Sequence, residues 1–165
     1  MALDVLILMG SDSDAAVMSA AGDVLRGFGL RFEMTVASAH RSPARVLRLI
    51  DDAHARGVKV FIVGAGAAAH LAGVVAAHTT RPVIGVPIDS SALKGLDALL
   101  STVQMPPGVP VATVSIGKPG ATNAAVLAAQ MIAIGDRALS DKLAAYKRML
   151  EENVEDAAKR LHDQR

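Results

Sequence analysis

Short apolar segments alternate with longer amphipathic segments along this chain of 165 residues, and no other feature constrains its fold as much. The apolar segments are nearly continuous in hydrophobic character, which is typical of strands buried on both faces of a sheet. We expect five strands, over residues 3–9, 32–37, 58–63, 82–86 and 111–115. Strands that alternate with helices through short links form a parallel sheet with helices on both faces. The alternation therefore predicts an α/β protein, a three-layer α/β/α sandwich with a flavodoxin-like sheet.

Helical spacing of apolar residues fills the intervals between these strands. We expect helices over residues 14–28, 43–57, 69–78, 92–103 and 121–134, with a loop of small residues from Gly64 and another loop at 117–120. Either Ser11 or Ser13 can cap the first helix, and Gly29 is placed to end it.

The tail from residue 137 is helical and more charged, with a stripe formed by Leu139, Leu143, Tyr146 and Leu150. The sequence leaves open whether this tail packs on its own domain or reaches a neighbouring subunit. No repeat or linker divides the chain. We therefore expect one catalytic domain over residues 1–165, with its core at 3–135 and a C-terminal helical tail at 137–165.

Composition excludes several classes of function. The net charge is +1, from 17 basic and 16 acidic residues, so nothing draws the chain as a whole to nucleic acid or to a membrane surface. Only 2% of residues are aromatic, which argues against base stacking and against a flavin carrier, and no cysteine is present. No apolar run is long enough for a membrane span, and no signal peptide is recognisable, so we expect a cytoplasmic protein.

The loop after the first strand contains Ser11, Ser13 and Asp14 at the carboxyl edge of the predicted sheet, where open α/β folds bind ligands. It matches neither the dinucleotide fingerprint nor the phosphate-binding loop. Serine hydroxyls and backbone N–H groups there could hold a phosphate, whereas the carboxylate of Asp14 suits a sugar diol. Taken alone, the loop is more simply interpreted as a helix cap.

The loop after the second strand reads Ser-Ala-His-Arg-Ser-Pro over residues 38–43. Histidine changes its protonation state near neutral pH, so His40 can give and take protons, and Arg41 offers a fork that fits a phosphate. Two polar loops at one sheet edge favour a ligand site. Together they predict an enzyme that acts on a small phosphorylated substrate by proton transfer.

The third loop, from Gly64 to His70, consists of small residues that let a backbone approach a planar ligand or another helix. His70 could bind a carboxylate or lie in a close-packed interface, and the residues alone leave this undecided. His54 reads as a surface residue and His162 as part of the tail. No metal-ligand spacing of histidines is present, so we predict no metal.

These loops, taken in order, resemble the bacterial phosphoribosylaminoimidazole carboxylase family, whose common form is a mutase of purine biosynthesis. The matching segments are residues 9–14, 38–43, 64–71, 82–87, 99–106, 108–113 and 116–121, and the resemblance covers residues 3–135. The chain departs from the family pattern at Ala15, where Trp is usual, and at Ala72, where Pro is usual.

The resemblance implies an isomerisation without ATP, metal or organic cofactor. The carboxylate leaves the exocyclic nitrogen of N5-carboxyaminoimidazole ribonucleotide as CO2, which is trapped while carbon 4 of the ring is carboxylated. It implies His40 and His70 as catalytic residues, with His40 handling the proton on carbon 4. The substrate-binding residues implied are Ser11, Ser13, Asp14, Ser38, Ala39, Arg41, Gly66, Ala67 and Leu71.

The resemblance further implies a homo-octamer with shared active sites, to which residues 104–106 contribute, and a possible hand-over of substrate from the ATP-dependent synthetase that makes it. Three alternatives stay open. They are direct carboxylation of aminoimidazole ribonucleotide by CO2, a non-catalytic ribonucleotide-binding module, and a flavin-binding electron carrier suggested by fold alone.

Overall fold

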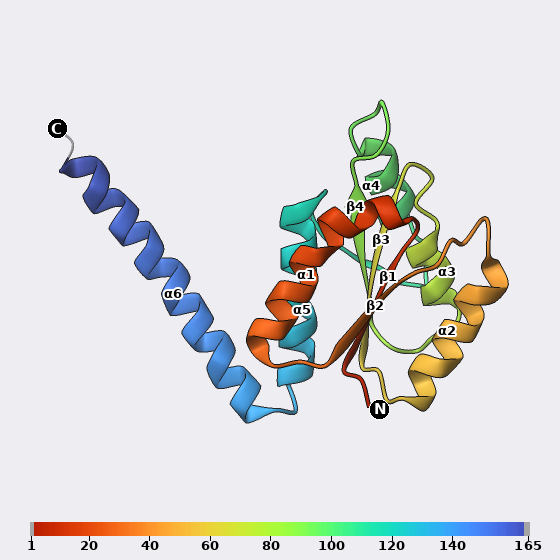
Figure 1. Cartoon of the computed structure of the whole chain (residues 1–165), viewed down its shortest axis with the longest axis horizontal. Helices are drawn as coiled ribbons and strands as arrows, with labels where there is room; N and C mark the ends of the chain where they lie inside the picture. Colours follow the sequence, from red (N-terminus) through yellow and green to blue (C-terminus); the bar gives the residue numbers. More distant parts are fainter. Residues whose placement is uncertain (1, 164–165) are drawn as a thin grey trace.

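The computed structural model describes residues 2–163 and contains a sheet of five parallel strands in the order β2-β1-β3-β4-β5 (Figure 1). The strands are β1 (Val5–Met9), β2 (Phe32–Val36), β3 (Val60–Gly66), β4 (Val83–Ile88) and β5 (Ala112–Thr113). The helices are α1 (Ala15–Phe28), α2 (Pro43–Ala55), α3 (Leu71–Ala77), α4 (Leu96–Val103), α5 (Lys118–Ala133) and α6 (Arg137–His162). This order confirms the predicted flavodoxin-like arrangement.

Both faces of the sheet are covered, because successive residues of a strand point to opposite sides. On one face Ile7, Ile62 and Ile84 pack with α1, α5 and the start of α6. On the other face Leu8 and Phe61 pack with α2, α3 and α4. The core is aliphatic, as the composition predicts, and within residues 2–163 no helix is long and apolar enough to cross a membrane.

Two boundaries differ from the sequence prediction for the same reason, the presence of glycine. β3 continues to Gly66, because residues 64–66 pair with residues 86–88 of β4 instead of forming a loop. α5 begins at Lys118, so residues 118–120 belong to a helix and were wrongly predicted as loop. A side chain at Gly120 would overlap the carbonyl oxygen of Ser115, so this close approach is open to glycine alone. A prediction based on the spacing of apolar side chains cannot detect positions where glycine belongs to a strand or a helix.

Other elements are shorter than predicted. α4 begins at Leu96, because turns occupy the preceding residues and Gly95 has φ +84°. β5 has only two residues, and beyond it the pairing with β4 continues through single contacts such as Val114 N–H to Gly85 O. The first helical segment is a 3₁₀ turn over Asp12–Asp14 that leads directly into α1, and Gly29 ends α1 as predicted.

The last helix, α6, packs on the body only near its start and then projects away from it (Figure 1). The side chain of Asp136 accepts a hydrogen bond from Leu139 N–H at 3.0 Å, and Tyr146 meets Phe28 edge to face at 5.5 Å. Lys142 Nζ donates to the carbonyl of Phe28 at 2.8 Å. Of the predicted stripe, Leu139, Leu143 and Tyr146 contact the core, whereas Leu150 is exposed.

Candidate active site

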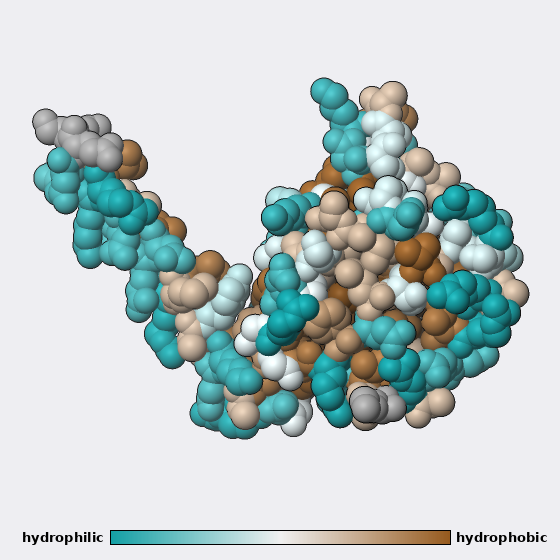
Figure 2. All heavy atoms as spheres, viewed as in Figure 1, coloured by the Kyte–Doolittle hydropathy of each residue, from teal (hydrophilic) through white to brown (hydrophobic). Residues whose placement is uncertain are grey.

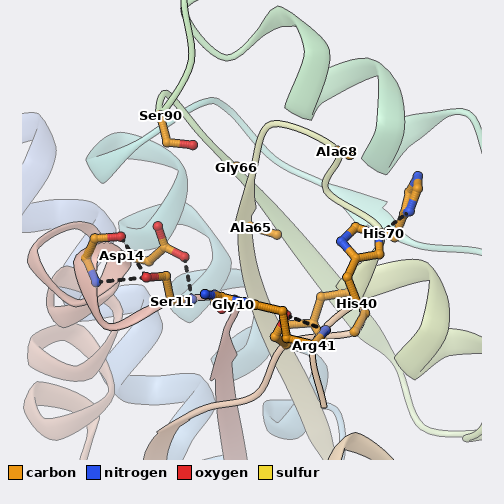
Figure 3. Close-up of a pocket in the computed structure, with 14 residues that line it drawn as sticks. Gly10, Ser11, Asp14, His40, Arg41, Ala65, Gly66, Ala68, His70 and Ser90 are labelled. Carbon is orange, nitrogen blue, oxygen red and sulfur yellow. Dashed lines mark hydrogen bonds between the residues drawn. The ribbon is translucent and has the colours of Figure 1, made fainter. Parts of the chain in front are cut away.

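A pocket of about 300 Å³ lies at the carboxyl edge of the sheet, between the loops that follow β1, β2, β3 and β4 (Figure 3). Parallel strands deliver these loops to one edge, and ligands of open α/β folds bind there. Ten of the eleven predicted site residues line the pocket: Ser11, Ser13, Asp14, Ser38, Ala39, His40, Arg41, Gly66, His70 and Leu71. Ala67 is not among the lining residues; it is exposed and holds a φ of +51° in the turn after β3.

The loop after β1 is held by a reciprocal pair of hydrogen bonds, each from a backbone N–H to a side chain. Ser11 Oγ accepts from Ser13 N–H at 3.4 Å, and Asp14 Oδ2 accepts from Ser11 N–H at 3.1 Å. Ser13 Oγ lies 3.0 Å from Ser11 Oγ, so the two hydroxyls stand side by side at the pocket. The capping that the sequence suggests is therefore present, and it also orients the groups available to a ligand.

Asp14 is a buried carboxylate, 5% exposed, and within residues 2–163 no basic side chain forms an ion pair with it. Burial raises the pKa of Asp14, and the nearby charge of Asp12 adds to the rise, while the backbone N–H groups of Ser11 and Gly10 oppose it. A carboxylate in this position gains from hydrogen-bond donors that a ligand brings, such as the hydroxyls of a sugar.

Arg41 ties the loop after β2 to the loop after β1. Its Nη2 donates to the carbonyl of Gly10 at 3.1 Å, and its backbone N–H donates to Ser38 Oγ at 3.2 Å. Its Nε lies 3.4 Å from the same hydroxyl. Arg41 itself is exposed, so the guanidinium is anchored by two loops and accessible to an anion at the pocket mouth.

His40 and His70 meet across the pocket from loops that lie 30 residues apart in the chain. His40 Nε2 is 2.7 Å from His70 Nδ1, and the rings stand edge to face with centroids 4.8 Å apart (Figure 3). One ring must donate an N–H and the other must accept it, so the hydrogen bond links the tautomers of the two imidazoles. Such a pair can take a proton from one ligand atom and return it to another.

Four residues that line the pocket were absent from the predicted set: Gly10, Ala65, Ala68 and Ser90. The signal for Ser90 was available, because it follows β4 at the same edge of the sheet as the other polar loops. The absence of a side chain at Gly66 makes room for Ser90 in the pocket wall, since a Cβ at this position would overlap the Ser90 hydroxyl. Within residues 2–163, no group of three or more histidine or acidic side chains is arranged to hold a metal ion.

A family model described as AIR carboxylase matches residues 4–153. The chain belongs to the AIR carboxylase family. It is 50% identical over 157 residues to the N5-carboxyaminoimidazole ribonucleotide mutase of Pyrococcus horikoshii, covering 95% of this chain and 88% of the relative. It is 55% identical over 137 residues to the mutase of Bacillus subtilis, covering 83% and 85% of the two chains.

Other members of the AIR carboxylase family agree with this assignment. The phosphoribosylaminoimidazole carboxylase of Saccharomyces cerevisiae is 52% identical over 148 residues, which are 90% of this chain and 26% of that longer protein. The crystal structure of Treponema denticola PurE superposes with a TM-score of 0.84 at 29% identity, covering 94% of this chain and 96% of that one. The fold and the family are therefore shown by independent comparisons.

Proposed function

We propose that this chain is an isomerase that converts N5-carboxyaminoimidazole ribonucleotide to 4-carboxy-5-aminoimidazole ribonucleotide in purine (IMP) biosynthesis. One observation supports this above all: the His40–His70 pair shares a pocket with Arg41 and four serines. A proton-transfer pair and an anion-binding end within one pocket suit a phosphorylated substrate whose ring carbon gains a carboxylate and loses a proton. The relatives whose length this chain spans are named mutases, which favours this reaction over direct carboxylation by CO2.

The substrate's phosphate is assigned to the end of the pocket formed by Arg41, Ser13 and Ser38. Arginine binds phosphate through charge-assisted hydrogen bonds, and the hydroxyls add neutral donors. Asp14 accepts from the ribose hydroxyls, because a buried carboxylate repels the phosphate but gains from hydroxyl donors. Ser11, next to it, helps to position the ribonucleotide. This orientation directs the imidazole ring toward the ends of β3 and β4.

His40 acts on the proton of carbon 4. The bond between the exocyclic nitrogen and the carboxylate carbon breaks, its electron pair stays on nitrogen, and the nitrogen takes up a proton. Carbon 4 then bonds to CO2 and gives its proton to His40. One proton is consumed and one is released, so the imidazole pair can carry the balance without any cofactor.

The wall next to this step is formed by uncharged residues, with Gly66, Ala39 and Leu71 beside His70. We assign Ala67, in the turn beyond, a contact with the substrate through its backbone. A closed wall matters because CO2 that escapes into water is lost from the product. His70 contributes by its hydrogen bond to His40 and by its position next to the carboxylate.

A paired assay tests the proposal. One reaction contains N5-carboxyaminoimidazole ribonucleotide without added bicarbonate, and the other contains aminoimidazole ribonucleotide with bicarbonate at physiological concentration. We expect efficient product formation only in the first. Efficient formation only in the second would make the chain a direct carboxylase, and tight binding without conversion would make it a ribonucleotide-binding module.

We also infer that the chain works as a homo-octamer with shared sites, in which residues 104–106 reach a neighbouring pocket. Exposed apolar side chains support an assembly of this kind. Most of the large ones lie in the α4 region and on α6 (Figure 2): Leu93, Leu96, Leu100, Val103, Met149, Leu150, Val154 and Leu161. The core at 3–135 would then carry the chemistry, with the tail at 137–165 serving assembly. Light scattering combined with assay upon dilution checks this, because a fully active monomer contradicts it.

We propose that the chain works in the cytoplasm, beside the ATP-dependent synthetase that supplies its unstable substrate. A transient hand-over between the two enzymes would protect that substrate. A coupled assay with a competing reaction that consumes free substrate tests this. Product formation that the competitor does not reduce indicates hand-over, and product formation that it reduces indicates release into solution.

A further inference from the structure

Ser90 is a polar side chain in the active-site pocket that the proposed reaction has not used. It lies two residues beyond the end of β4, its side chain is exposed, and it lines the pocket with the histidines (Figure 3). Its hydroxyl lies so close to Gly66 that a Cβ added to Gly66 would overlap it. The hydroxyl thus lies against a wall that otherwise presents the small residues Ala65, Gly66 and Ala68.

The hydroxyl of Ser90 has no hydrogen-bond partner among residues 2–163, whereas the adjacent serine is fully engaged. Ser91 Oγ donates to Asp97 Oδ2 at 2.7 Å and accepts from Leu93 N–H at 3.1 Å. These contacts fix the turn between β4 and α4 without any help from Ser90. The structure of the loop therefore gives no reason for the hydroxyl at position 90.

The order of the strands decides which part of the substrate lies near Ser90. The loops after β2 and β1 carry the arginine and the serines assigned to the phosphate, and β3 and β4 follow on the far side of β1 from β2. With the phosphate held at Arg41, the ring and its carboxylate extend toward Gly66 and Ser90. A donor at this place meets the carboxylate and not the phosphate.

We propose that the Ser90 hydroxyl donates a hydrogen bond to the carboxylate that the reaction moves, and so retains CO2 between its release and its capture. This role rests on the proposed mutase function. The carbon–nitrogen bond breaks with its electron pair on the protonated nitrogen, and carbon 4 bonds to the CO2 carbon as its proton passes to His40. No group is oxidised or reduced. As negative charge returns to the carboxylate oxygens, a hydrogen bond from Ser90 strengthens, which favours capture over escape.

Retention of an isotope tests the role. The substrate carries ¹³C in its carboxylate, the buffer contains excess unlabelled bicarbonate, and the label in the product is measured together with kcat and KM. We expect wild type to retain most of the label, and Ser90→Ala to lose several times more of it and to turn over about tenfold more slowly, as for a lost hydrogen bond to a charged group. KM should change less, because the phosphate contacts remain.

Ser91→Ala is the matched control, since it removes a neighbouring hydroxyl that acts on the loop alone. We expect it to lower thermal stability and to retain label like the wild type. Equal retention by Ser90→Ala and wild type would overturn the role of Ser90, and so would an equal loss of label in Ser91→Ala. A folded wild type that makes no product would instead overturn the mutase function itself, together with this role.

Discussion

Strand β1 has a buried carboxylate near each end, and the two lie in opposite environments. At its start, Asp4 accepts hydrogen bonds from Arg31 at 2.9 and 3.0 Å, and Lys59 Nζ lies 3.2 Å away. The hydrogen bond to Arg31 is the main cause that lowers the pKa of Asp4 to about 2. At its far end, Asp14 has no such cation, and burial raises its pKa.

The difference separates stability from function between the two ends of β1, since Asp4 precedes the strand and Asp14 lies in the 3₁₀ turn that follows it. Asp4 is satisfied by the protein's own cations, so it contributes to folding and has no capacity left for a ligand. Asp14 lies in a place that disfavours its charged form, which raises its pKa, destabilises the folded protein slightly at neutral pH and prepares a site for donors. Substitutions at the amino end should therefore change stability, and substitutions at the carboxyl end should change catalysis.

The largest effect is expected for His40→Asn, which removes the proton-transfer group while keeping a side chain of similar size. We expect kcat to fall by about 10³-fold or more, with substrate affinity and unfolding free energy nearly unchanged, because His40 is exposed. Steady-state kinetics and thermal melts measure both. His54→Asn is the control, since His54 contacts Thr79 outside the pocket and its loss should leave kcat intact.

Arg41→Lys should come next, because lysine keeps the charge and loses the fork. We expect KM to rise roughly tenfold and kcat to fall less, as for the loss of a charge-assisted hydrogen bond to phosphate. Arg48→Lys, exposed on α2 and outside the pocket, is the matched control. An unchanged KM in Arg41→Lys would contradict the assignment of the substrate's phosphate to this end of the pocket.

Asp4→Asn should lower the unfolding free energy by roughly 1–3 kcal/mol at pH 7 and leave kcat/KM alone. The folded pKa of Asp4, about 2, is below its ordinary value of 3.8, so its stabilisation is present above pH 3.8 and is lost as pH falls through 2. Urea unfolding across this range should show the difference between wild type and variant vanishing in acid. Asp23→Asn, in an exposed pair with Arg26, should cost almost nothing.

Asp14→Asn should have a small effect on stability, in the direction opposite to that of Asp4→Asn. The raised pKa means that ionised Asp14 destabilises the folded state at neutral pH, so the neutral amide should raise Tm by a few degrees at most. The gain should disappear at low pH, where Asp14 is protonated in both states. Substrate binding should weaken at the same time, and a variant that binds as tightly as wild type would contradict the assignment of Asp14 to the ribose.

Most of the fold could be predicted from the sequence, because apolar runs and helical spacing report burial directly. The wrong boundaries of β3 and α5 lie where glycine replaces a side chain. Gly64 and Gly66 read as loop, yet they are strand residues whose missing side chains make room for Met18 and Ser90. Ser90 itself was overlooked, since two serines after a proline-containing strand look like an ordinary turn.

A parallel α/β sandwich with polar loops at one edge follows from the order of the amino acids, because periodicity and loop chemistry are local properties. The three-dimensional packing alone decided that His40 and His70 share a hydrogen bond, and that Arg41 is anchored by the neighbouring loop. It also decided that the pKa of Asp4 is lowered and that of Asp14 is raised, although both are aspartates close to one strand. The physical reason is that protonation and hydrogen bonding depend on neighbours in space, which the linear chain does not specify.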